Sequence, residues 1–320
     1  MVTLSDIQSA RARLRGVSVH TPLVEFKLCA EDPRRLFLKP ENQQPIGAFK
    51  LRGAYNKIAS LSPGDRKRGV ISYSSGNHAQ GVAYAARALG TKAVIVMPNN
   101  APAIKRQATA ALGAEIVFVG PGSAERQAKA EELAAEHGYV VVPPYNDEQI
   151  IAGQGTMGLE ILEDLPDLEM VLAPVGGGGM LAGVATAIKL SKPSLKVIGV
   201  EPELAGDAQA SLRAGKIVQF HSDEVSRTIA DGLRTQSIGA INFEHIRRYV
   251  DDIITVSEDE IRQAMKYLVS NSGTVAEPSG AVAVAGFIFH AAQLPQAKLA
   301  VAIVSGGNID PKMLEEIRET

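Results

Sequence analysis

Four consecutive glycines, Gly176 to Gly179, are the strongest chemical signal in this chain of 320 residues. They follow the apolar run MVLAPV and precede the helical pattern MLAGVATAIKL, so they join a strand to a helix. Backbone N–H groups without helical partners converge there, and the helix dipole favours an anion such as phosphate. We therefore expect Gly176, Gly177, Gly178 and Gly179 to cradle a phosphate, although a tight packing turn would explain the same residues.

The same loop also carries a dinucleotide-binding pattern. Gly177, Gly179 and Ala182 fit the spacing G-x-G-x-x-A, and Glu201 ends the next apolar run, where an acid would bind ribose. No Lys-Ser or Lys-Thr pair follows the glycines, which excludes a P-loop. A smaller α/β segment precedes this strand, and that position argues against a dinucleotide fold. Other residues must therefore decide which phosphate compound is bound.

Lys50 lies beside Phe49 in the stretch KPENQQPIGAFKLRGAYNKI, at the start of a predicted helix. A lysine taken alone is most often a solvated surface charge. A second strand, GVISY, runs into the loop SSGNHAQG, where small polar residues stand at another helix N-terminus. Their donors suit a carboxylate, or they cap the helix; they are Ser74, Ser75, Gly76, Asn77 and His78.

A third strand, LAVAIV, ends in Ser305, which two glycines follow. Open α/β sheets bind ligands at the C-terminal ends of their strands, so this hydroxyl is a candidate ligand contact. An amine, a phosphate cradle and hydrogen-bonding loops are together what pyridoxal phosphate requires, for an imine link, its phosphate and its ring. Lys50 and the three loops therefore predict a pyridoxal phosphate site.

Eleven motifs run along nearly the whole chain: HTPL, GAFKLRGAY, SSGNHAQG, APAIKRQATAALGA, PPYND, IAGQGT, PVGGGGMLAG, GVEPELAGD, TIADG, AEPSGA and SGGN. In these motifs and in their order, the chain resembles the serine/threonine dehydratase and serine racemase family of fold-type-II pyridoxal phosphate enzymes. The resemblance implies an α/β fold of two open, twisted parallel-sheet lobes flanked by helices, with the cofactor between them. It also implies a dehydratase, or ammonia-lyase, that converts a 3-hydroxy amino acid such as L-serine or L-threonine to a 2-oxo acid and ammonia by β-elimination.

The resemblance implies roles for the residues around the cofactor. Lys50 looks like the lysine that forms the imine and then removes the Cα proton, and Phe49 like the stacking partner of the ring. Asn77 would donate to the 3-oxygen of the cofactor, and the four glycines would hold its phosphate. Ser305 would face the pyridine nitrogen, where a neutral hydroxyl leaves the ring a weaker electron sink and favours prompt loss of a β-substituent.

Substrate contacts are also implied by the resemblance. The residues implied around the substrate carboxylate are Ser74, Ser75, Gly76 and His78. Ser75 is similar to the second acid or base of the racemases, across the ring from Lys50, so racemisation is an alternative function, alone or as a second activity. Tyr145 would line the substrate pocket, although packing explains a tyrosine equally well. Ala48 stands where the family usually has serine, which bears on substrate preference rather than on the imine.

An Mg²⁺ or Ca²⁺ site is implied in GVEPELAGD, with the carboxylates of Glu201 and Asp207 and the carbonyl oxygen of Ala205 as ligands. Two acids in a loop are usually just solvated, so this site rests on the resemblance. The six histidines form no HExxH pair, which argues against a catalytic zinc site. A more distant alternative function is an NAD-dependent dehydrogenase, in which Glu201 would bind ribose. A metal bound by Glu201 would leave this carboxylate unavailable for ribose.

Apolar runs that alternate with helical stretches must position these loops. Unbroken apolar runs predict strands buried on both faces, and helical segments between them predict parallel sheets. The predicted strands are LFL near 36, GVISY near 70, KAVIVM near 93, EIVFV near 116, YVVV near 140, MVLAPV near 171, KVIGV near 197 and LAVAIVS near 300. We expect a large cofactor-binding domain at 1–52 and 146–320, a small inserted α/β domain at 53–145, and a ligand site between them.

Composition limits the partners of this chain. The net charge is −2, from 33 basic and 35 acidic residues, so neither nucleic acid nor an anionic membrane surface is an expected partner. Two uncharged runs, Met170 to Ile188 and Pro278 to Ala297, are interrupted by proline, glycine or histidine and are expected to lie in the core.

The remaining expectations concern location and assembly. The N-terminus lacks an apolar signal region, and a single cysteine, Cys29, cannot form an intrachain disulfide. These features predict a cytoplasmic protein in which Cys29 is a small buried residue. The resemblance suggests a homodimer, and the short stretch after SGGN leads us to expect no C-terminal regulatory domain.

Overall fold

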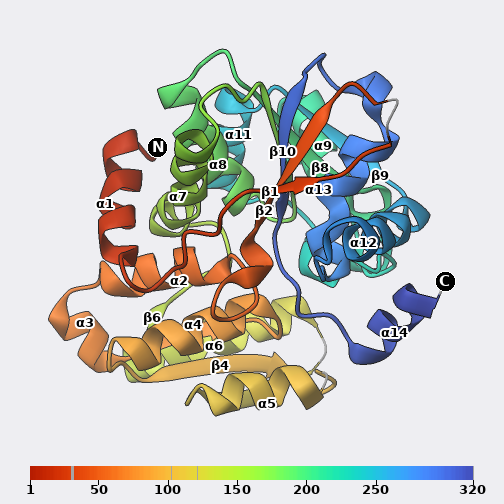
Figure 1. Cartoon of the computed structure of the whole chain (residues 1–320). Coiled ribbons are helices and arrows are strands. Elements are labelled where there is room, and N and C mark those ends of the chain that lie inside the picture. Colours follow the sequence, from red (N-terminus) through yellow and green to blue (C-terminus); the bar gives the residue numbers. More distant parts are fainter. Residues whose placement is uncertain (30–31, 102, 121, 320) are drawn as a thin grey trace.

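Two β-sheets built mainly from apolar runs form the centres of two lobes, one above the other in Figure 1. The structure is a computed structural model that describes residues 1–29, 32–101, 103–120 and 122–319. The strands are β1 (Val24–Phe26), β2 (Arg35–Pro40), β3 (Val70–Tyr73), β4 (Ala93–Pro98), β5 (Glu115–Val119), β6 (Val140–Val141), β7 (Met170–Pro174), β8 (Lys196–Pro202), β9 (Asp252–Val256) and β10 (Leu299–Val304).

Helices and short 3-10 turns connect the strands. The helices are α1 (Leu4–Leu14), α2 (Lys50–Ala59), α3 (Pro63–Arg68), α4 (Asn77–Ala88), α5 (Ala103–Ala111), α6 (Ser123–His137), α7 (Glu148–Asp164), α8 (Gly179–Ser191), α9 (Asp207–Ala214), α10 (Ser222–Val225), α11 (Ala240–Tyr249), α12 (Glu258–Ser272), α13 (Pro278–Phe289) and α14 (Pro311–Glu319). The 3-10 turns are η1 (Glu41–Gln43), η2 (Glu203–Ala205), η3 (Asp231–Leu233) and η4 (Ala291–Gln293).

The larger sheet has the strand order β1-β2-β10-β7-β8-β9. Edge strand β1 runs antiparallel to β2, and the other neighbours are parallel. Successive side chains of β7 enter opposite cores: Val171 packs in a cluster with α1, α7, α8 and α11, whereas Leu172 packs with α12 and α13. Burial on both faces explains why these strands read as uninterrupted apolar runs.

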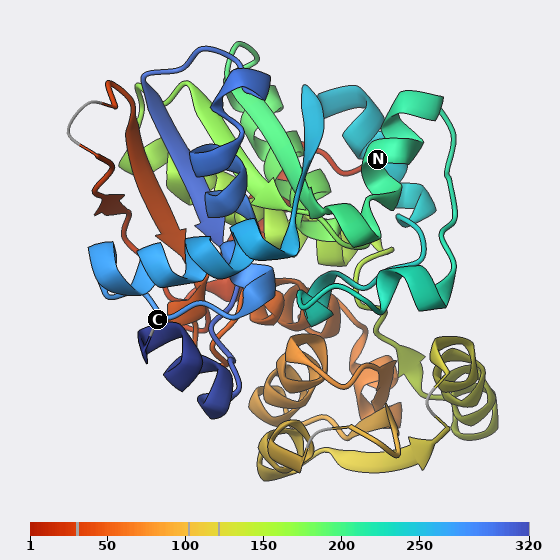
Figure 2. The same ribbon diagram turned by 90° about the vertical axis from the view of Figure 1, so that its right-hand side faces the viewer.

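The smaller sheet has the order β5-β4-β3-β6 and is parallel throughout. Residues of β3 alternate in the same way: Val70 packs with α2 and α4, and Ile71 packs on the opposite face with Ala130 of α6. Figure 2 shows this lobe below the larger one. The predicted fold of two parallel-sheet lobes flanked by helices is confirmed, while the predicted boundaries at 52/53 and 145/146 stay a prediction.

The structure corrects one expectation about the core. Cys29 was expected to be buried and is exposed, because it lies in the loop that follows edge strand β1. The two long uncharged runs form β7, α8 and α13, whose residues are mostly buried. Within the described ranges, no helix combines the length and the apolar character that crossing a membrane requires.

Candidate active site

Lys50 is the first residue of α2, at the end of the loop that leaves β2. Its Nζ donates to the carbonyl oxygen of Pro144 at 2.8 Å and lies 5.2 Å from the centre of the Phe49 ring. In the part of the chain that the structure describes, no carboxylate pairs with this amine. The residue is only partly covered, yet its ammonium group lies deep enough that burial lowers the pKa of Lys50 to about 8.

The serine loop after β10 contacts the segment that precedes Lys50. The N–H of Phe49 donates to the carbonyl oxygen of Ser305 at 3.0 Å, and Ala48 forms an isolated β-bridge with Gly306. The Ser305 side chain is buried and its hydroxyl donates to the carbonyl oxygen of Ser279 at 3.3 Å. The structure therefore brings Phe49, Lys50 and Ser305 together, from two motifs that are far apart in the sequence.

Asn77, the first residue of α4, joins the same cluster. Its Nδ2 donates to Oε1 of Glu277 at 2.6 Å, and its Oδ1 accepts from Nδ2 of Asn308 at 2.8 Å. An amide nitrogen carries two hydrogens, so one N–H of Asn77 stays available for a ligand. This arrangement fits a donor to a ring oxygen whose direction is set by Glu277 and Asn308.

The glycine loop lies between β7 and α8 and has free donors. In the described structure, the N–H groups of Gly176, Gly177 and Gly178 donate to no protein acceptor. Gly178 is the N-cap of α8 with φ +88°, a conformation that L side chains rarely adopt. Unpaired N–H groups at a helix N-terminus fit a phosphate group, so the loop meets this requirement of pyridoxal phosphate.

Tyr145 packs directly on this loop. A Cβ added at Gly177 would lie 2.3 Å from the Tyr145 ring, and one added at Gly179 would lie 3.1 Å from the Tyr145 Cβ. Burial raises the pKa of Tyr145 to about 12, with smaller contributions from Tyr73 and Asp207. The Tyr145 hydroxyl therefore stays protonated at neutral pH. The position of the Tyr145 ring also requires Gly177 and Gly179 to lack side chains.

The serine and histidine residues after β3 differ in their partners. Ser74 accepts from the N–H of Gly76 at 3.3 Å, and the Ser75 hydroxyl has no partner among the described residues. The His78 ring is buried and contacts the carbonyl oxygen of Val142 at 3.0 Å. Burial and then nearby Lys50 lower the pKa of His78 to about 3, so the ring is neutral and its Nε2–H donates to that carbonyl.

Glu201 at the end of β8 and Asp207 at the start of α9 form a buried acidic pair. Glu201 accepts from the N–H groups of Ala208 and Gln209 at 3.1 and 2.8 Å. Neither oxygen of Asp207 has a hydrogen bond of ordinary geometry within the described chain, although two backbone N–H groups and the hydroxyl of Thr235 lie close enough to oppose the rise of its pKa.

Burial raises the pKa of both acidic groups. The pKa of Asp207 reaches about 7, and that of Glu201 lies well above its usual value because Asp207 adds to the effect of burial. Two buried carboxyls that lie close together fit a divalent cation with further oxygen ligands, such as the carbonyl of Ala205 in η2. Across the described ranges, no cluster of three or more His, Cys, Asp or Glu side chains adds to it.

Glu277 and Asn308 are site residues that the sequence reasoning did not single out. Both lie within motifs that carried the resemblance, AEPSGA and SGGN, but a lone acid or amide has no local pattern that marks it as a partner of Asn77. Asn242 is a third such residue, because its Nδ2 donates to the carbonyl oxygen of Gly177 and so fixes the position of the glycine loop.

Comparisons with known proteins agree with this geometry. The family profile described as pyridoxal-phosphate dependent enzyme matches residues 16–306. An L-threonine ammonia-lyase of Thermotoga maritima is 45% identical over 318 residues, which cover 99% of this chain and 78% of that protein. An L-threo-3-hydroxyaspartate ammonia-lyase of Saccharomyces cerevisiae is 41% identical over 311 residues, covering 97% of this chain and 94% of that protein.

A solved structure gives the same result for the fold. Maize serine racemase matches with a TM-score of 0.94 and 36% identity, over 98% of this chain and 96% of the racemase chain. The family profile and the relatives cover the Lys50 loop, the glycine loop and the Ser305 loop together. This chain therefore belongs to the pyridoxal-phosphate dependent enzyme family.

Proposed function

We propose that this protein is an ammonia-lyase that converts a 3-hydroxy amino acid to a 2-oxo acid and ammonia, with L-threonine and L-serine as the first substrates to test. Water is lost by β-elimination and is taken up again when the resulting enamine, as its imine, hydrolyses and releases ammonia. The family of this protein and its ammonia-lyase relatives support this proposal. The NAD-dependent alternative loses its support, because Glu201 is bonded to the N–H groups of Ala208 and Gln209 and the chain belongs to a pyridoxal phosphate family.

The proposal divides the work among the described loops. The N–H groups of Gly176 to Gly179 would bind the phosphate, and Phe49, Asn77 and Ser305 would hold the ring. Ser74, Ser75, Gly76 and His78 would surround the substrate carboxylate, with Tyr145 beside them. When bound, pyridoxal phosphate supplies the electron sink that makes the Cα proton of an amino acid removable.

The environment of the Lys50 amine is the observation that carries this proposal. The amine donates to the carbonyl oxygen of Pro144 and pairs with no carboxylate of the described chain, and burial brings its pKa to about 8, so a useful fraction is unprotonated near neutral pH. An unprotonated amine can first bind the cofactor and later accept the Cα proton. A lysine held by a carboxylate ion pair would stay charged and could do neither.

The test is a substrate panel with a matched pair of lysine variants. The holoenzyme is incubated with L- and D-serine, L- and D-threonine and L-threo-3-hydroxyaspartate, and 2-oxo acid and ammonia are measured. Lys50→Ala is expected to lose turnover and the visible absorbance of the bound cofactor. Lys57→Ala, on the same helix and paired with Asp147 at 2.6 Å, is the control and is expected to keep both. Equal turnover by Lys50→Ala and the parent, or nicotinamide in the purified protein, would contradict the proposal.

Racemisation is the second candidate, because the Ser75 hydroxyl has no protein partner within the described residues and so is free to exchange a proton with a ligand. The maize serine racemase match adds weight to this alternative. Chiral analysis of the serine left in the same assay separates the two reactions. We expect 2-oxo acid to accumulate faster than the other enantiomer, and Ser75→Ala to reduce enantiomer formation more than elimination.

Three further features belong to the same proposal. Glu201, Asp207 and the carbonyl of Ala205 would bind Mg²⁺ or Ca²⁺, since buried carboxylates need a cation to stay ionised. The protein would act as a homodimer in the cytoplasm. The large domain at 1–52 and 146–320 and the small one at 53–145 would close around the substrate.

A further inference from the structure

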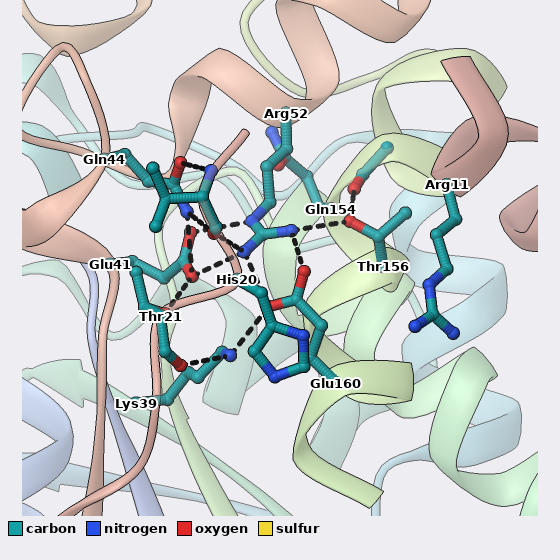
Figure 3. A network of polar contacts seen from close by, with 12 residues as sticks. Arg11, His20, Thr21, Lys39, Glu41, Gln44, Arg52, Gln154, Thr156 and Glu160 are labelled. Atoms are coloured by element: carbon teal, nitrogen blue, oxygen red, sulfur yellow. Dashed lines mark hydrogen bonds and ion pairs between the residues drawn. The ribbon is translucent and has the colours of Figure 1, made fainter. Parts of the chain in front are cut away.

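Arg52 is buried at the centre of a network of charged side chains (Figure 3). Its Nε and Nη2 donate to the two carboxylate oxygens of Glu41, each at 2.8 Å. Its Nη1 and Nη2 donate to the two oxygens of Glu160 at 2.7 and 2.8 Å. Two bidentate contacts fix the plane of the guanidinium group.

The remaining contacts complete the coordination of Arg52. Nη1 donates to the hydroxyl of Thr156 at 3.1 Å, and Nη2 also lies 3.1 Å from the carbonyl oxygen of Val19, which shares one of the two Nη2 hydrogens with a carboxylate. Lys39 contacts Glu160 at 2.6 Å from the other side. A lysine in place of Arg52 could not reproduce this pattern, because an ammonium group is a point charge and lacks the planar fork.

The network joins segments that are distant in the sequence. Glu41 begins η1 directly after β2, and Glu160 lies on α7. Glu41 and Arg52 therefore bracket the loop that leads to Lys50. At the other side of this loop, the N–H of Phe49 donates to Ser305. Lys50 is thus held between the Arg52 network and the serine loop.

Helix α2 has little free space at its first turn. A Cβ added at Gly153 of α7 would lie 2.6 Å from the Arg52 carbonyl oxygen, and one at Gly81 of α4 would lie 3.1 Å from that of Lys50. Each residue turns an α-helix by about 100°, so Lys50 and Arg52 project about 160° apart. A small rotation of α2 at Arg52 would therefore displace the Lys50 amine across the site.

The Arg52 network affects Lys50 through the position of α2 rather than through an electrostatic field. Lys39 and Arg52 balance Glu41 and Glu160, and the pKa of Lys50 is lowered by burial without a contribution from these four groups. Well-packed apolar residues of similar volume often match or exceed the stability of a buried ion cluster. Stability alone thus does not explain why these four side chains are charged. The bidentate contacts of Arg52 with Glu41 and Glu160 instead restrict α2 to a single position and rotation.

We propose that Arg52 is a positioning residue for the elimination, which holds the first turn of α2 so that the Lys50 amine meets the Cα proton of the substrate. This inference rests on the proposed role of Lys50 as the base. A displacement of about 1 Å can lower a rate by about 10²-fold, so the effect is expected on turnover more than on substrate binding.

The central variant is Arg52→Lys, which keeps the charge and removes the fork. The matched control is Arg34→Lys: Arg34 forks onto Asp32 at 2.9 and 2.7 Å, immediately before β2. We expect the Arg52→Lys holoenzyme to lose about 10²-fold in kcat with KM changed by no more than about twofold. Arg34→Lys is expected to keep both constants.

A second measurement reports position without turnover. The visible circular dichroism of the bound cofactor depends on how the lysine and the ring are held relative to each other. Per molecule of bound cofactor, we expect this signal to change in Arg52→Lys and to stay the same in Arg34→Lys. Urea unfolding of the same proteins separates this effect from a loss of stability.

A milder pair keeps the test decisive if Arg52→Lys folds poorly. Thr156→Val removes one acceptor from Arg52 and keeps the shape of the side chain, whereas Thr156→Ser restores the hydroxyl. We expect Thr156→Val to lower kcat several-fold and shift the circular dichroism, and Thr156→Ser to recover both.

Unchanged kcat and circular dichroism in Arg52→Lys and Thr156→Val would overturn the proposal. So would equal losses in Arg34→Lys, because these would follow stability rather than position. A parent enzyme that turns over no 3-hydroxy amino acid would instead contradict the proposed function. In that case the circular dichroism still reports whether Arg52 positions Lys50.

Discussion

The side-chain nitrogen of Asn77 donates a hydrogen bond of 2.6 Å to Oε1 of Glu277, which lies 200 positions later in the chain. Glu277 is buried, and burial together with nearby Asp231 raises the pKa of its carboxyl to about 8. The opposite end of the Asn77 amide accepts from Asn308 at 2.8 Å. Residues from two other loops therefore decide which way the free N–H of Asn77 points.

Glu277→Gln is predicted to change the pH dependence of stability. The carboxyl keeps its proton in the folded protein up to about pH 8 but loses it in the unfolded chain near 4.5, so its stabilising contribution is lost as the pH rises through this interval. We expect unfolding free energy to fall in the parent by a few kcal/mol over this range and to fall less in Glu277→Gln. Urea unfolding at a series of pH values between these two pKa values measures the change in unfolding free energy. Glu25→Gln, at an exposed carboxyl, is the control and should follow the parent.

The kcat for elimination is predicted to rise with pH through about 8. Lys50 must be unprotonated to accept the Cα proton, and burial brings its pKa to about 8. The assay follows 2-oxo acid formation at saturating substrate in buffers on both sides of this value. A substrate deuterated at Cα shows whether proton removal limits the rate. A flat profile with a full isotope effect would refute Lys50 as the titrating base.

Removal of divalent cations is predicted to destabilise the protein, more at pH 8 than at pH 6. Burial raises the pKa of Asp207 to about 7 and that of Glu201 well above its usual value, so both ionise as the pH rises and then need a cation. Thermal unfolding with chelator, Mg²⁺ or Ca²⁺ measures the effect. Asp207→Asn should abolish it, and Asp223→Asn, at an exposed acid, should retain it. A cation effect that survives Asp207→Asn would locate the ion elsewhere.

Gly177→Ala is predicted to weaken cofactor binding and lower stability, because its Cβ would lie 2.3 Å from the Tyr145 ring. Cofactor loading is measured by titration of the apoprotein with pyridoxal phosphate. Adding Tyr145→Ala to the same chain should restore part of the loading by making room. Gly64→Ala, where the nearest atom is the Ser62 hydroxyl at 3.8 Å, should behave as the parent. Normal loading of the single variant would show that the loop tolerates a side chain.

Most of the strands were predictable, and the missed ones have a physical reason. The eight runs predicted as strands are β2, β3, β4, β5, β6, β7, β8 and β10. Apolar runs of this kind are stable only between covering helices, so their pattern is strong. β1 is a three-residue edge strand with Glu25 at its centre, and β9 begins at the second residue of the acidic pair Asp251 and Asp252, so the apolar part of each strand is short.

Residue types and local turns in the sequence determined which chemistry is available: the Lys50 amine, the glycine loop and the Ser305 hydroxyl. These features depend on the identity of the side chains and on the backbone freedom of the neighbouring residues. Both are properties of the local sequence and do not depend on the tertiary fold. Only the tertiary structure decided what holds them. Glu277 bonds Asn77 across 200 positions and Arg52 bonds Glu160 across 108, and such contacts follow no local periodicity, because only the packing of whole lobes brings their atoms together.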